Sequence, residues 1–434
     1  MKCVRGLLLL LGVAVLTAGS ASAQSGRPTL IRNVTLIDGT GTPPLPGAWV
    51  LIKGDGIVSV PPSPVPADGA AVIDGTGKFL IPGLIDSHVH VMGGRMVRPD
   101  GTLYVDRPFA LSRLQAYLYA GVTSVFDSGN NPDFIFGLRE EERAGSIKSP
   151  RIFATGGLVT APGGYADSPT SIAVSDFKAD MPKLMAQIKR KPDVQKMIFD
   201  RLGAFGTPMA PTIDPPLLEQ VAALFNQNGI PTTIHISTEE DARVSMAAGL
   251  NAFAHPIHAA ATRETTQELA LRRLPISTTI TVYAHIATVA DAPEFLDSPL
   301  FRDTLEARER ERQKNEERQR SISSGMSARF KLMLPYMVKT VKQLHDAGAI
   351  LALGTDRTWG ASVHMELDQL AKAGIPLQDL VRIATLNGAY YLHREKDLGS
   401  IERGKLAELV LLKSDPTRSV AAYADIDQVW KGGQ

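Results

Sequence analysis

Two histidines, His88 and His90, stand one residue apart at the end of residues 81–90, which read IPGLIDSHVH. Successive side chains of a strand alternate between its faces, so both imidazoles would point the same way and suit one metal cation. A lone His-x-His pair is a weak signal, because most such histidines lie on a surface or in a core. The preceding Pro82-Gly83 pair marks a change of element and strengthens the metal-site interpretation.

A lysine stands inside an apolar stretch further along the chain. Lys196 belongs to residues 193–200, which read DVQKMIFD. An unpaired ammonium group in a protein core is unfavourable, so another group must compensate its charge. The alternative is a lysine whose stem lies along apolar surface while its ammonium group reaches water.

Eight short apolar segments separated by helical stretches are the elements that would position these side chains. They span residues 84–91, 123–128, 151–157, 195–200, 232–237, 251–256, 275–281 and 350–356. The alternation favours an α/β fold, a parallel (β/α)8 barrel, which gathers functional groups at the C-terminal ends of its strands. Before the barrel, β-rich segments at 29–38, 49–60 and 71–80 predict a small antiparallel sheet, and strand-like sequence returns at 407–413.

Composition excludes several classes of protein. The chain has 434 residues, of which 44% are apolar and 21% charged, with one cysteine. This is ordinary globular composition, which excludes a disordered chain, a coiled coil and a disulfide-rich miniprotein. The formal net charge of +1 gives no sign of a nucleic-acid surface or a polybasic membrane anchor.

The first 23 residues have the pattern of a secretory signal peptide. Lys2 and Arg5 precede an apolar run at 6–18, and Ala21-Ser22-Ala23 offers a small-residue cleavage site. The run is short for a membrane span, which is the alternative interpretation. We therefore expect a periplasmic or secreted protein with no membrane partner after cleavage. Cys3 would leave with the peptide, so any metal must be held by histidine, carboxylate or a lysine-derived oxygen.

Several motifs along the chain resemble those of one superfamily. They are residues 75–90, GVTSV at 121–125, LGTD at 353–356, TLNGA at 385–389 and LGSIERGKLAE at 398–408. Together they resemble the amidohydrolase superfamily of metal-dependent hydrolases, in its imidazolonepropionase-like and Xaa-Pro dipeptidase-like branch. The resemblance implies a TIM-like barrel at 83–397 and a small β-sandwich formed by both termini, at 24–82 and 398–434.

The resemblance also implies a set of metal ligands at the strand ends. His88 and His90 would bind the more buried of two divalent ions, and His235 and His255 would bind the second. Asp356 would ligate a metal and take the proton of the attacking water. The alternatives are buried core imidazoles for His235 and His255 and a helix N-cap for Asp356.

Lys196 would be carboxylated in such a protein and would bridge two divalent ions, for which zinc is expected. Gln195 departs from the family, which usually has an aliphatic residue at that position. Three further residues are candidates for substrate binding. Tyr165 stands where many relatives have histidine and would donate to an oxyanion, Arg357 would suit a substrate carboxylate, and His364 would contact substrate or support the site.

The remaining features are given structural roles. His258 is expected to support the site, because the strand before it already ends at residue 256. An outward arginine paired with a loop remains the alternative for Arg357. The charged run from Arg302 to Arg320 predicts a solvated helix with spaced Glu/Arg pairs rather than a substrate-gripping lid. No role is given to His285.

These observations predict a secreted binuclear metal-dependent hydrolase of dipeptidase or carboxypeptidase type. A hydroxide bridging two ions would attack the amide carbonyl of a dipeptide or an N-acyl amino acid, including bulky aryl-acyl amino acids. One rival is a mononuclear cyclic-amide hydrolase of imidazolonepropionase type, which would not need Lys196. Another is a non-catalytic binding protein on the same fold. The partner would be a small molecule, and a homo-oligomer remains open.

Overall fold

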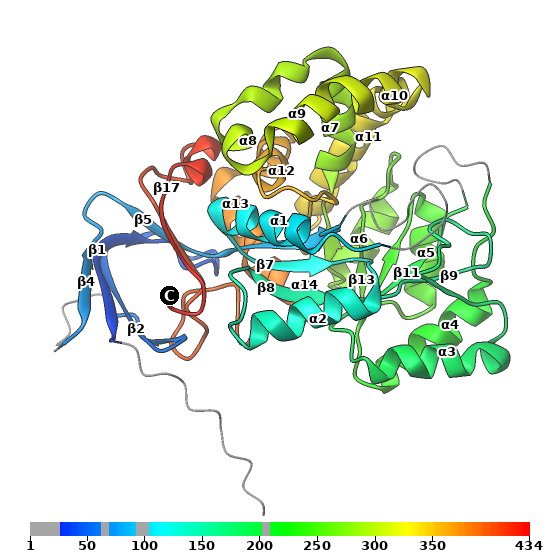
Figure 1. Cartoon of the computed structure of the whole chain (residues 1–434), viewed down its shortest axis with the longest axis horizontal. Helices are drawn as coiled ribbons and strands as arrows, with labels where there is room; N and C mark the ends of the chain where they lie inside the picture. Colours follow the sequence, from blue (N-terminus) through cyan, green and yellow to red (C-terminus); the bar gives the residue numbers. More distant parts are fainter. Residues whose placement is uncertain (1–26, 62–68, 93–103, 202–208) are drawn as a thin grey trace, which may run out of the picture.

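The computed structural model describes residues 27–61, 69–92, 104–201 and 209–434. The predicted signal segment, residues 1–23, lies outside these ranges. Figure 1 shows a β-rich part beside a larger part in which strands and helices alternate.

Strands from both ends of the described chain form one seven-stranded sheet in the β-rich part. They are β1 (Thr29–Leu36), β2 (Leu45–Lys53), β3 (Gly56–Ser59), β4 (Ala71–Asp74), β5 (Phe79–Pro82), β16 (Leu409–Leu412) and β17 (Ile426–Trp430). Their order is β17-β16-β5-β1-β2-β3, and β4 pairs with β1. Strand β16 runs antiparallel to β5 with Leu411 opposite Leu80, and both side chains are buried in a shared apolar core.

The prediction of a purely antiparallel sheet is wrong, because β1 pairs in parallel with both β4 and β5. The predicted strand at 71–80 is broken by a turn in which the amide of Lys78 donates to the carbonyl of Gly75 at 2.8 Å. The φ angle of Gly77 in this turn is 77°, a conformation that glycine adopts without strain. The turn lets two successive short strands pair with β1.

The eight predicted barrel segments each contain or overlap an observed strand. The strands are β6 (Leu84–Val89), β7 (Val122–Asp127), β8 (Arg151–Ala154), β11 (Gln195–Ile198), β12 (Thr232–His235), β13 (Ala252–Phe253), β14 (Ile276–Ser277) and β15 (Leu351–Ala352). Within each sheet neighbouring barrel strands are parallel. Strands β9 (Val159–Thr160) and β10 (Ile172–Ala173) extend the sheet beside β11.

Backbone hydrogen bonds join the two groups of barrel strands at both seams. The amide of Ser87 on β6 donates to the carbonyl of Leu353 after β15 at 2.9 Å. At the other seam, the amide of Asp193 before β11 donates to the carbonyl of Ala154 on β8 at 3.0 Å. The predicted α/β barrel class is thereby confirmed.

Helices follow the strands and cover the barrel. They are α1 (Arg107–Tyr119), α2 (Pro132–Arg143), α3 (Phe177–Lys189), α4 (Pro215–Gln227), α5 (Glu239–Ala247), α6 (Arg263–Leu271), α7 (Ile280–Asp291), α11 (Met326–Asp346), α12 (Ser362–Lys372), α13 (Leu377–Ala384) and α14 (Leu386–Tyr391), with a short turn η4 (Val420–Ala424) before β17. Polar residues fix where several of them begin. Thr238 and Asp241 form a capping box on α5, and Asp176 caps α3.

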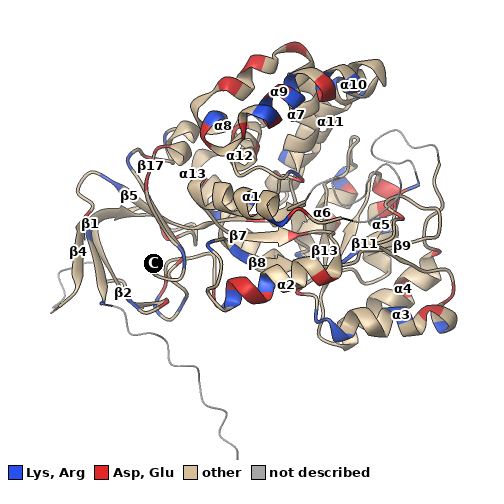
Figure 2. Ribbon diagram, viewed as in Figure 1, with Lys and Arg blue, Asp and Glu red and all other residues tan. Residues whose placement is uncertain are grey.

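A run of short helices is inserted between α7 and α11, and we call it the insert (residues 293–323). It contains η2 (Pro293–Asp297), α8 (Pro299–Thr304), α9 (Ala307–Arg312), the π-helical turn η3 (Gln313–Glu317) and α10 (Arg318–Ser323). Figure 2 shows that basic and acidic residues are interspersed along these helices.

Charged pairs connect the terminal sheet to the barrel. Arg151 at the start of β8 lies 2.8 Å from Glu408, and Lys431 pairs with Glu142 of α2. These contacts fix the terminal sheet against the N-terminal ends of the barrel strands. Within the described ranges, no helix is long and apolar enough to cross a membrane.

Candidate metal centre

The first histidine pair lies at the end of β6. His88 is fully buried, and its Nδ1 is 2.9 Å from the carbonyl oxygen of Ala254. Nδ1 of His90 is 3.1 Å from the carbonyl oxygen of Gly129. A carbonyl oxygen only accepts, so Nδ1 donates in both rings, and Nε2 is the ring atom that can bind a metal.

The second histidine pair lies on the neighbouring strand ends, and each ring is also held through one nitrogen. Nε2 of His235 is 2.9 Å from Oδ2 of Asp200, so Nδ1 keeps its lone pair. Nδ1 of His255 is 2.9 Å from Oγ1 of Thr279, which leaves Nε2. The two ring centroids are 4.5 Å apart.

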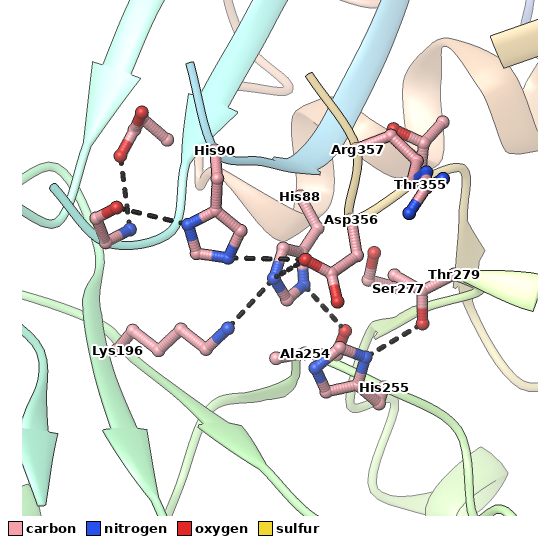
Figure 3. A network of polar contacts seen from close by, with 12 residues as sticks. His88, His90, Lys196, Ala254, His255, Ser277, Thr279, Thr355, Asp356 and Arg357 are labelled. Atoms are coloured by element: carbon pink, nitrogen blue, oxygen red, sulfur yellow. Dashed lines mark hydrogen bonds and ion pairs between the residues drawn. The ribbon is translucent and has the colours of Figure 1, made fainter. Parts of the chain in front are cut away.

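Asp356 and Lys196 complete the cluster. Asp356 follows β15, and its Oδ1 lies 3.3 Å from Nε2 of His90 and 3.6 Å from Nε2 of His88. Nζ of Lys196 on β11 is 2.9 Å from the same Nε2 of His88. Figure 3 shows these side chains and His255 converging from the ends of several strands. His88, His255 and Asp356 each offer one ligand atom within 4.8 Å of the others.

Asp86, two residues before His88, ties β6 to the end of β15. Its Oδ1 accepts from the amides of His88 at 3.2 Å and Thr355 at 3.0 Å, and its Oδ2 accepts from the Thr355 hydroxyl at 2.7 Å. Asp86 thus fixes the backbone on both sides of the pair formed by His88 and Asp356.

Burial governs the ionisation of the cluster. Burial lowers the pKa of His88 and His255 well below the usual value, so both imidazoles are in the neutral form that binds metals. Burial likewise lowers the pKa of Lys196 to about 8. For Asp356, burial raises the pKa. The neighbouring His88 and Lys196 and the hydrogen bond with His90 lower it by more, so the carboxylate remains ionised.

This donor set fits a divalent cation. Neutral imidazole nitrogens and a carboxylate are typical protein ligands of zinc, and partners on the far side of each ring fix its orientation. The four predicted histidines, Lys196 and Asp356 are all brought to one place by five strand ends, those of β6, β11, β12, β13 and β15.

A comparison with protein families identifies the type of protein. The model of the amidohydrolase family matches residues 79–434. The chain belongs to the amidohydrolase family. This amidohydrolase is therefore an enzyme of a family that hydrolyses carbon–nitrogen bonds with the help of metal ions, and the resemblance stated from the sequence is confirmed.

Relatives of this amidohydrolase differ in the reactions that their names describe. It is 26% identical to a 5'-deoxyadenosine deaminase of Methanothermobacter thermautotrophicus over 427 residues, which cover 88% of this chain and 87% of the relative. It is 36% identical to an imidazolonepropionase of Treponema denticola over 115 residues, 24% of this chain and 27% of that one. A solved Xaa-Pro dipeptidase with bound methionine has the same fold, with a TM-score of 0.74 and 20% identity over 94% of this chain and 98% of its own.

A cavity of about 890 Å³ lies over the cluster. Its lining includes His90, Lys196, His235, His255 and Asp356. Tyr165 and Arg357, both predicted to bind substrate, also line it.

The two predicted substrate residues differ in their surroundings. The ring centroid of Tyr165 lies 4.8 Å from that of His235, and burial raises the pKa of Tyr165 far above its usual value, so its hydroxyl stays protonated. The guanidinium group of Arg357 lies 4.5 Å from the ring centroid of Trp359. Burial lowers the pKa of Arg357 to about 10, so this group stays charged at neutral pH.

His364 does not face the cavity, which corrects its predicted contact with substrate. It lies in the first turn of α12, and its Nε2 donates to the carbonyl of Ala120 at the end of α1, at 2.9 Å. It is not among the described residues that line the cavity. The side chain joins two barrel helices because the α12 turn directs it outward, toward the neighbouring helix.

The charged run also differs from its prediction as a solvated helix. Six residues of the insert line the cavity: Glu309, Arg312, Gln313, Glu317, Arg320 and Ser321. Glu309 is only 5% exposed, because Arg312 lies 2.8 Å from it and neutralises its charge. The spaced Glu/Arg pairs are present, and most charged residues of the run stay exposed or half-exposed as predicted, but the run forms several short helices and Glu309 is buried beside Arg312.

Residues of the site that were missed from the sequence include Asp86, Asp200, Thr279 and His285. Asp200 ends a predicted strand, so the strand-end rule that selected the histidines could have included it. Thr279 follows β14 in the same way. His285 lines the cavity from α7, where its ring lies 4.8 Å from that of Trp359, and no sequence signal separates it from a core residue.

Proposed function

We propose that this chain is a binuclear metal-dependent amidohydrolase that cleaves the amide bond of an N-acyl amino acid or a dipeptide. The observation that carries the proposal is the set of four histidines, each held through one ring nitrogen by another group, with the second nitrogen left for a ligand. Two divalent ions, zinc in our proposal, would acidify a water molecule and polarise the amide carbonyl when bound.

Lys196 supports a site for two ions rather than one. Its Nζ is buried beside His88, whose Nε2 lies 2.9 Å away. Addition of carbon dioxide to the neutral amine would form an N–C bond, release one proton and give a carbamate with two oxygen ligands. We propose this modification because it replaces a buried cation next to metal ions by an anion.

Asp356 would move the proton of the reaction. Its carboxylate is ionised and lies beside the histidines at the floor of the cavity. It would accept a proton from the attacking water and pass it to the leaving nitrogen. Tyr165 would donate a hydrogen bond to the oxygen of the tetrahedral carbon, because its hydroxyl stays protonated.

The size of the cavity favours the bulky members of the substrate class. A volume of about 890 Å³ is in the upper part of the range for sites that enclose drug-sized ligands. Val282, Ile286 and Val289 of α7 present an apolar wall to it, and Trp359 closes that side. An aryl-acyl amino acid would place its ring system against this wall and its carboxylate near Arg357.

The test combines metal content with product analysis. Purified protein should contain close to two zinc ions per chain, and chelation should abolish release of the amino acid from an N-benzoyl amino acid. Full activity with one ion per chain would favour the mononuclear rival of imidazolonepropionase type. Absence of hydrolysis across N-acyl amino acids and dipeptides, with both ions bound, would refute the proposed substrate class.

A second candidate reaction is deamination, which is favoured by the similarity to a 5'-deoxyadenosine deaminase over 88% of the chain. Release of ammonia from 5'-deoxyadenosine would identify it, whereas the proposed reaction releases an amino acid. The two products are measured in parallel on one preparation.

We also propose export of the protein to the periplasm or the medium. The proposal depends on the signal-like pattern in residues 1–23. Sequencing the amino terminus of the protein purified from its native host would test it, with Gln24 expected as the first residue.

A further inference from the structure

The amino end of α7 is capped by a group from another helix. Thr279 precedes the helix with φ 37° and ψ 29°, and its side chain makes no cap hydrogen bond. Threonine at this position usually turns its hydroxyl to the free amides of the first turn. Here Oγ1 of Thr279 lies 2.9 Å from Nδ1 of His255 instead.

Glu366 of α12 supplies the missing cap. Its Oε1 accepts from the amide of Ile280 at 3.0 Å, and its Oε2 accepts from the amide of Thr281 at 2.7 Å. The side chain is fully buried. A carboxylate at this end of a helix satisfies two free amides and lies at the positive end of the helix dipole.

We propose that Glu366 is a positioning residue for the His255 side of the metal centre. By capping α7, it leaves the hydroxyl of Thr279 free to hold the His255 ring, whose Nε2 then faces Asp356 and His88. The inference rests on the metal centre proposed above.

Glu366 does not touch the metal ligands, but it affects them through the Thr279 hydroxyl, for which the His255 ring and the amides of α7 compete. Without Glu366, the buried amides of Ile280 and Thr281 lack this acceptor, and Thr279, the N-cap residue of α7, has a hydroxyl of the kind that caps helices. Turning to the helix would remove it from His255. The ring would then lose the partner that fixes both its orientation and the position of its proton.

Zinc affinity tests this route without measuring turnover. Metal-free protein is titrated with zinc against a competing chelator, and the affinity of the weaker-binding ion is compared among variants. Glu366→Gln has one carboxamide oxygen in place of two acceptors, and Thr279→Val removes the hydroxyl but keeps the shape. Each should weaken that affinity about tenfold to a hundredfold. The double variant should lose no more than the larger single loss, because both changes act through one contact.

Two further variants separate positioning from a general loss of structure. Thr279→Ser keeps the hydroxyl and should stay close to wild type. Glu142→Gln removes another buried carboxylate, the partner of Lys431, and should lower stability without changing zinc affinity.

Unchanged affinity in a folded Glu366→Gln protein, or additive losses in the double variant, would overturn the inference. If Glu366→Gln does not fold, the Thr279 variants decide, and equal affinities of Val and Ser would reject the route. A wild-type protein that binds no second zinc ion would instead refute the metal centre itself.

Discussion

Replacing Arg357 with alanine is expected to slow hydrolysis of substrates that have a free carboxylate and to spare their amidated analogues. A charge-assisted hydrogen bond contributes about 1.5–3 kcal/mol. The lower end applies here: burial lowers the pKa of Arg357 overall, and the carboxylates of Asp356, Glu317 and Glu309, which oppose this shift, already share its charge. The expected loss in kcat/KM is therefore about tenfold.

The assay is a comparison of two proteins on two substrates, an N-acyl amino acid and its amide, with zinc content measured in both proteins. The carbonyl of Arg357 accepts from the hydroxyl of Tyr117 at 3.0 Å, and this backbone contact survives the substitution. Arg357→Lys is the matched control for charge, since lysine keeps the charge but lacks the planar group that stacks on Trp359. Equal losses on acid and amide would refute carboxylate recognition by Arg357.

Three further predictions follow from other parts of the site and its support. Lys196→Ala should lose most bound metal and activity, with partial recovery on adding short carboxylic acids, whereas two bound ions and normal turnover would show that the lysine is not a ligand. Asp200→Ala should weaken zinc binding about tenfold to a hundredfold by removing the acceptor of His235 Nε2, as measured by chelator competition, and an unchanged affinity would contradict this role. For Glu239 of α5, burial raises the pKa, but hydrogen bonds from Thr262, Thr265 and Arg243 outweigh it and lower the pKa to about 2. The stabilisation by ionised Glu239 is present above pH 4.5 and is lost as the pH falls toward 2. Over that interval the free energy of unfolding, measured in urea, should therefore fall less for Glu239→Gln than for wild type. Parallel pH curves for the two proteins would disprove this.

The barrel was predictable because its strands are short apolar runs between helical stretches, and the positions of polar residues at the ends of those runs follow from the same pattern. His88 and His90 illustrate this, since strand alternation alone places them on one face. Lys196 was singled out because an ammonium group inside an apolar run is costly wherever the run folds. These inferences use only local sequence and one rule of barrel geometry.

The insert and the partners of the histidines depend on contacts that local sequence does not contain. The run from 302 to 320 has the charge spacing of a solvated helix, and only the packing of α9 over the cavity buries Glu309, beside Arg312 of the same helix. The outward direction of His364 depends in the same way on where α1 ends. Likewise, the mixed pairing of β1 depends on a turn that divides one apparent strand into two.

Backbone strain connects the cluster to the strands that hold it. Asp356 has φ 51° and Thr279 has φ 37°, and these two residues follow neighbouring strands, β15 and β14. A left-handed conformation at a non-glycine residue costs about 1–3 kcal/mol and persists only where the surroundings fix it. The amide of Asp356 donates to the carbonyl of His88 at 2.8 Å, and the amide of Thr279 donates to the carbonyl of Gly354 at 3.0 Å. The backbone amide of each strained residue is thus hydrogen-bonded to the adjoining strand end. A shift of Asp356 would move its carboxylate, and a shift of Thr279 would move the ring of His255. The rim of the barrel therefore positions the cluster as one unit.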